Sequence, residues 1–160
     1  MPSRFQATLR TATILHLALV MSVAMYGVAL WFVAGTGRGM VLNLNLVLPA
    51  AAASALLVAA GAALLRRSSL SQRREPAGIE EEGDLSLEDP ASQAAAGRWH
   101  TTNILTWALC EVVALHGFIL SFLSHDLRIY AGFAVAAWIL MAAWRPRAVD
   151  LRELVLGARS

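Results

Sequence analysis

The stretch TTNILTWALCEVVALHGFILSFL, residues 101–123, decides the fold class, because it is mostly apolar and contains a single carboxylate. As an α-helix rising 1.5 Å per residue, it matches the hydrocarbon core of a bilayer, about 30 Å thick. The carboxylate, Glu111, would then lie close to the bilayer midplane. An ionisable side chain costs at least about 2.5 kcal/mol at that depth, so it is rarely without a role. The stretch therefore predicts a membrane-spanning helix with a candidate functional residue at its centre.

The composition of the whole chain agrees with a membrane protein. Of its 160 residues, 58% are hydrophobic and 15% charged, and the mean hydropathy is +0.58. Soluble domains carry about 25% charged residues. The net charge of +2 gives no reason to expect a nucleic-acid partner. The single cysteine, Cys110, lies inside the apolar stretch, which excludes an internal disulfide and leaves redox chemistry without support.

Hydropathy predicts an all-α integral membrane protein with four transmembrane helices, at about 11–33, 43–65, 101–123 and 127–144. The basic residues are all arginines and concentrate before the first helix, between the second and third, and after the fourth. The positive-inside rule therefore places both termini and the central loop in the cytoplasm. Because arginine without lysine is typical of a GC-rich genome, we expect a multi-pass protein of a bacterial inner membrane.

The sequence also repeats itself. A shift of 90 residues aligns 11–33 with 101–123, and ten of these aligned positions are identical. An alanine-rich helix follows each copy, so the chain is predicted to form a single membrane domain of two tandem parallel-repeat hairpins, 11–65 and 101–144.

Two segments outside the repeats are predicted to be cytoplasmic. The linker 66–98 begins with a basic cluster suited to anionic headgroups and continues as an acidic, solvated stretch that could bind a partner. The tail 145–160 could form a short interfacial helix with Leu151, Leu154 and Val155 towards lipid.

Glu111 is the candidate ion-binding residue. Ala108 and Ala114 share its helix face and leave room for a neighbouring helix. In the first repeat Met21 stands at the position of Glu111, and Tyr26 at that of His116. His116, Tyr26 and the two alanines are therefore possible supporting residues. A second interpretation is a carboxyl that only hydrogen-bonds to a neighbouring helix and fixes its packing.

Metal and haem sites are not expected. On parallel helices His16 lies ten residues below the level of His116, about 15 Å in depth, so one iron cannot bind both. No spacing typical of metal ligands occurs among the four histidines. No nucleophile–histidine–acid set or phosphate-binding loop occurs either, so we expect no catalytic residues, no cofactor and no enzymatic activity.

Two ridges of small residues predict close helix packing in lipid. One ridge lies on the predicted helix 43–65 and the other on the predicted helix 127–144, and both have i+4 spacing. Their members are Ala51, Ala55, Ala59 and Ala63, and Gly132 and Ala136. The ridges could act within one molecule, join copies into a homo-oligomer or bind other membrane subunits.

The run EVVALHGFIL, residues 111–120, resembles the ion-carrying helix of the rotary-ATPase proteolipids, the subunit c family, in its duplicated hairpin form. The run MSVAMYGVAL, residues 21–30, has the Ala-x-Tyr-Gly part of that pattern and lacks the acid. The resemblance implies that Glu111 binds a proton or cation and that copies could form a ring.

The sequence thus supports a small four-helix membrane protein similar to subunit c, whose midplane carboxylate binds a proton or cation. The alternative is a non-transporting membrane scaffold or accessory subunit of a larger membrane complex, whose alanine ridges bind other helices.

Overall fold

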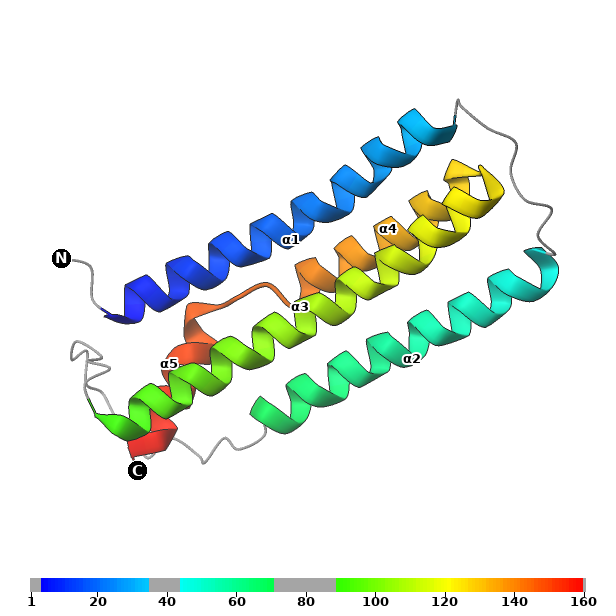
Figure 1. Ribbon diagram of the computed structural model, residues 1–160. Coiled ribbons are helices and arrows are strands. Elements are labelled where there is room, and N and C mark those ends of the chain that lie inside the picture. The colour runs from blue at the N-terminus through cyan, green and yellow to red at the C-terminus, as the bar shows by residue number, and fades with distance from the viewer. Residues whose placement is uncertain (1–3, 35–43, 71–88, 160) are drawn as a thin grey trace.

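The computed structural model describes residues 4–34, 44–70 and 89–159, in which the regular elements are all α-helices (Figure 1). The five helices, in chain order, are α1 (Arg4–Ala34), α2 (Leu44–Leu70), α3 (Pro90–Ser124), α4 (Leu127–Ala143) and α5 (Ala148–Arg159). The predicted all-α fold class is confirmed. Most of the acidic stretch predicted between the repeats lies outside the described residues.

Helix α3 occupies the centre of the bundle. It packs against α1, α2, α4 and α5, and α1 packs in addition against α4. Helices α1 and α2 lie on opposite sides of α3 and make hardly any contact with each other (Figure 1). The predicted first hairpin is therefore not a packed helix pair, whereas α3 and α4 do pack together. Hydropathy could not reveal this, because a lipid-facing and a helix-facing surface are equally apolar.

Helices α1 and α3 run in the same direction, as the repeat predicted, and α4 runs back between them (Figure 1). The equivalent glycines of the two repeats allow this packing. A Cβ atom on Gly27 would lie 2.9 Å from Tyr130 Cε1, and one on Gly117 would lie 2.5 Å from Phe133 Cβ. Both glycines therefore act as contact points for α4, one on each neighbouring helix.

Helix α3 is longer than its predicted span. It begins at Pro90, which suits the first turn of a helix, and the side chain of Asp89 caps it by accepting a 2.8 Å hydrogen bond from the Ser92 amide. It ends at Ser124, because the capping residue His125 has a positive φ of 56° that stops the helix. The predicted linker 66–98 is therefore too long at both ends, since α2 continues to Leu70 and α3 starts at Pro90. At 35 residues α3 exceeds the bilayer core by several turns.

Helix α5 packs on these additional turns of α3. Leu151 and Val155 are fully buried in a cluster with Trp99 and Trp107 of α3. The prediction that these side chains of the tail 145–160 face lipid is wrong, because the apolar face of α5 meets the aromatic side chains of α3 instead.

Three helices, α1, α2 and α3, are long and apolar enough to cross a membrane. Helix α4 passes the same test only together with α5, across a bend of 48°. Its 17 residues span about 26 Å, slightly less than the hydrocarbon core. The chain is therefore compatible with a multi-pass membrane protein of three or four spans.

Candidate functional site

Two hydroxyl groups of α1 converge on Glu111 of α3. Ser22 Oγ lies 2.6 Å and Tyr26 OH lies 2.7 Å from the same carboxyl oxygen, Oε1. Ser22 and Tyr26 are four residues apart and therefore lie on one face of α1, where both reach the parallel helix α3. The three side chains form a polar cluster, Glu111–Ser22–Tyr26, which we call the carboxyl site.

Ser22 has a second acceptor within reach. Its Oγ lies 2.7 Å from the carbonyl oxygen of Leu19 as well as 2.6 Å from Glu111 Oε1. A serine hydroxyl has one proton to donate and lone pairs to accept with. Ser22 can therefore donate either to the carboxyl or to the carbonyl, and when it donates to the carbonyl it can accept a hydrogen bond from a protonated carboxyl.

The walls of the carboxyl site are apolar. Ala114 is fully buried one turn after Glu111, and Phe118 one turn further contacts the ring of Tyr26 with centroids 5.5 Å apart. Ala108, on the preceding turn, is half-buried. The predicted small-residue face therefore lies where α1 approaches α3. Glu111 itself is half-buried and forms no salt bridge with any described residue.

His116 lies elsewhere. Its Nδ1 is 2.7 Å from the carbonyl oxygen of Val112 and its Nε2 is 3.0 Å from Ser54 Oγ of α2. With Nδ1–H donating to the carbonyl, Nε2 is left to accept a hydrogen bond from the Ser54 hydroxyl. His116 thus joins α3 to α2, while Tyr26, its counterpart in the first repeat, joins α1 to α3. Of the two predicted polar supporting residues, the fold brings Tyr26 to Glu111 and not His116.

The predicted small-residue ridges are only partly in contact with other helices. Ala55 is buried, Ala51 and Ala59 are half-buried and Ala63 is exposed. Gly132 and Ala136 of α4 are exposed. These residues of α2 and α4 therefore do not form one tight helix–helix contact.

Sequence reasoning did not identify Ser22 as a site residue. It sits one position after Met21, the counterpart of Glu111, and one turn before Tyr26. A hydroxyl residue so close to both positions was the available signal. Whether Ser22 reaches Glu111 depends on how α1 is rotated about its axis relative to α3, and the repeat alone does not specify this rotation.

Within the described ranges no three histidine, cysteine or carboxylate side chains gather as metal ligands. His16, the other histidine considered for a haem pair, packs against Trp107 with ring centroids 5.0 Å apart and ring planes tilted by 57°. The carboxyl site therefore contains one carboxyl and two hydroxyls, a set that suits a proton better than a transition metal.

Comparisons with known proteins assign this chain to no family: no protein-family model, no curated protein and no solved structure matches it.

Proposed function

We propose that Glu111 binds and releases a proton inside the membrane and that Ser22 and Tyr26 stabilise it in both states. The observation that carries this proposal is the convergence of the two hydroxyls on one carboxyl oxygen, at 2.6 and 2.7 Å. It agrees with the role that the resemblance to subunit c implies for this residue.

The two states follow from the hydrogen bonds available to Ser22. When Glu111 is ionised, Ser22 and Tyr26 both donate to Oε1, and hydrogen bonds to a charged acceptor are the stronger kind. When Glu111 is protonated, its hydroxyl donates to Ser22 Oγ, and Ser22 donates to the Leu19 carbonyl oxygen 2.7 Å away. No side chain has to move between the two states, which favours fast exchange.

A proton is favoured over a metal cation because the described ligands are few. One carboxyl and two hydroxyls offer fewer oxygens than Ca²⁺ or Mg²⁺ requires. Among the described residues, no group of three or more histidine, cysteine, aspartate or glutamate side chains that could hold a metal ion includes Glu111.

The test is covalent labelling of membranes that contain the intact protein with a hydrophobic carbodiimide, which reacts with protonated carboxyl groups. We expect labelling at Glu111, found by peptide mass mapping, that increases as the pH is lowered. Glu111→Gln serves as the control and should remove the label. Labelling absent at every pH contradicts the proposal, and labelling suppressed by Na⁺ at constant pH means that a cation binds instead.

The alternative of a non-transporting scaffold predicts a different pattern. Glu111→Gln would then leave co-purification with other membrane subunits unchanged, while Ala59→Leu, in the partly exposed ridge of α2, would abolish it. Labelling of Glu111 that depends on pH, in a protein that co-purifies with no other membrane subunit, favours the proton-binding function.

A further inference from the structure

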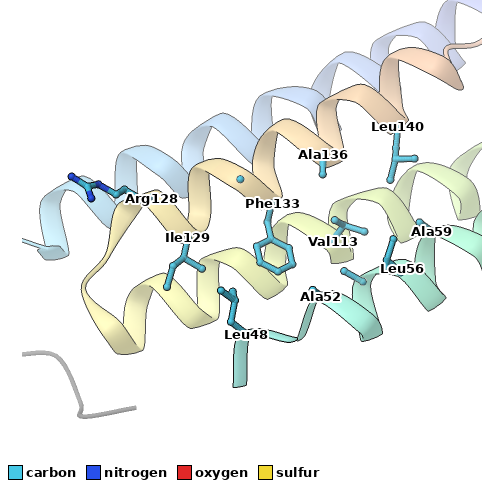
Figure 2. Close-up of a pocket in the computed structure, with 12 residues that line it drawn as sticks. Leu48, Ala52, Leu56, Ala59, Val113, Arg128, Ile129, Phe133, Ala136 and Leu140 are labelled. Atoms are coloured by element: carbon cyan, nitrogen blue, oxygen red, sulfur yellow. The ribbon is translucent and has the colours of Figure 1, made fainter. Parts of the chain in front are cut away.

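An apolar groove of about 570 Å³ separates α2 from α4 on the side of α3 away from α1 (Figure 2). Ala52 and Ala59 of α2 line one wall, and Gly132 and Ala136 of α4 line the other. Val113 of α3 lies between them. Two members of the α2 ridge, Ala55 and Ala59, thus face the α4 ridge across an open space instead of packing against it.

The groove opens to the surroundings of the bundle and needs an apolar occupant. Water is a poor occupant, because it requires two to four polar partners and nearly all of the lining side chains are aliphatic or aromatic. In a bilayer, hydrocarbon is available at this depth.

The length of the groove favours a lipid chain over a helix. It extends along α4 from Arg128 to Leu140, twelve residues or about 18 Å. One leaflet contributes about 15 Å of the hydrocarbon core, whereas a membrane-spanning helix of a partner would need a track of about 30 Å. Figure 2 shows the ring of Phe133 pointing into the groove beside Ile129 and Leu48, so the small-residue track is interrupted. A flexible chain can pass such a ring more easily than a straight helix can.

The positively charged side chain of Arg128 lies at one end of the groove (Figure 2). Arg128 is exposed at the first turn of α4, and its guanidinium forms no salt bridge among the described residues. Its backbone amide is bound by the capping carboxylate of Asp126 at 2.9 Å, which fixes the start of α4. Arginine matches the geometry of a phosphate group and suits the level of lipid headgroups.

We propose that this groove binds one anionic phospholipid, with an acyl chain along the groove between α2 and α4 and its phosphate on Arg128. The lipid belongs to the leaflet on the side of the α3–α4 turn. This site is separate from Glu111, which faces α1.

The test is native mass spectrometry of the purified protein in mild detergent, titrated with phosphatidylglycerol and, separately, with phosphatidylcholine. We expect one tightly bound phosphatidylglycerol per chain and about fivefold weaker binding of phosphatidylcholine, the factor that one basic residue at the headgroup level contributes. Arg128→Gln should make the two lipids equal. Equal binding of both lipids by the unaltered protein overturns the proposal.

A pair of glycine substitutions tests the groove itself. A Cβ on Gly132 meets nothing within 4 Å, and neither does one on Gly61, which does not line the groove. Gly132→Leu should fill the groove and lower phosphatidylglycerol binding at least tenfold, while Gly61→Leu should not change it, with equal helix content for both variants. Unchanged binding to Gly132→Leu overturns the proposal. A dimer of the unaltered protein that Gly132→Leu turns into monomers also overturns it, because the groove would then be a protein interface.

Discussion

Tyr26 and His116 occupy the same position in the two repeats, yet they form their hydrogen bonds on different sides of α3. Tyr26 donates to Glu111 across the α1–α3 contact, and His116 accepts from Ser54 across the α2–α3 contact. These two positions thus connect α3 by a polar bond to each of the helices that lie on its two sides. These bonds can be tested independently.

Tyr26→Phe should lower the free energy of unfolding by about 0.6–1.7 kcal/mol, the range for interhelical hydrogen bonds in membranes. Combined with Glu111→Gln, its effect should be less than additive, because the glutamine, which accepts without a charge, already weakens the hydrogen bond that Tyr26→Phe removes. Ser54→Ala serves as the control and should add fully to Glu111→Gln, since Ser54 bonds to His116. Denaturant titrations followed by circular dichroism measure all of these variants, and full additivity for Tyr26→Phe would contradict the shared bond.

Three Gly→Ala substitutions should rank in a fixed order of stability. All three gain the same helix propensity, so their differences report packing. Gly117→Ala should be the least stable, because the new Cβ meets Phe133 Cβ at 2.5 Å and overpacking costs about 1–3 kcal/mol. Gly27→Ala should be intermediate, because the Tyr130 ring can shift, and Gly61→Ala should be neutral or stabilising. Thermal unfolding in detergent gives the order, and a Gly117→Ala variant as stable as Gly61→Ala would refute it.

Arg66 should hold α5 in place. Its guanidinium donates to Asn103 Oδ1 at 2.9 Å and to Asp150 Oδ2 at 3.1 Å, and both charged side chains are 14% exposed. Arg66→Met removes two hydrogen bonds, and bonds involving a charged group contribute about 1.5–3 kcal/mol each. We expect faster trypsin cleavage at the exposed Arg152, while Arg67→Met, on an exposed neighbour, should leave the rate unchanged. Equal cleavage rates in the two variants would count against this role.

Leu151 should anchor α5 on α3. The side chain is fully buried, and Leu→Ala in such a position costs about 2–5 kcal/mol. Val149, on the exposed side of α5, should tolerate alanine. Hydrogen exchange of the α5 amides distinguishes the two variants, with protection lost in Leu151→Ala and retained in Val149→Ala. If both variants keep their protection, α5 is held by something other than this contact.

The sequence predicted helix positions better than helix neighbours. The apolar runs place the four long helices along the chain, although not the start of α3 at Pro90, and the repeat correctly implied that α1 and α3 are parallel. The sequence also indicated Tyr26 as a possible supporting residue of Glu111, because the repeat singled out both positions.

What the sequence could not provide is the rotation and choice of partners of each helix. The faces of α1 and α2 that meet lipid are as apolar as those that meet α3, so no periodicity distinguishes them. For this reason the sequence did not predict that Ser22 contacts Glu111, nor that α1 and α2 lie apart. The buried side of α5 was missed because amphipathic helices suit both a lipid surface and a protein surface.

The central position of α3 has a consequence for how the protein is made. Helices α1 and α2 are synthesised first, and they have hardly any contact with each other. If they enter a bilayer in chain order, they therefore remain separate helices until α3 is inserted, since α3 supplies the main contacts of both. The bundle can then form only after α3 has been inserted. Until that point, Ser22, Tyr26 and Ser54 lack their hydrogen-bond partners on α3.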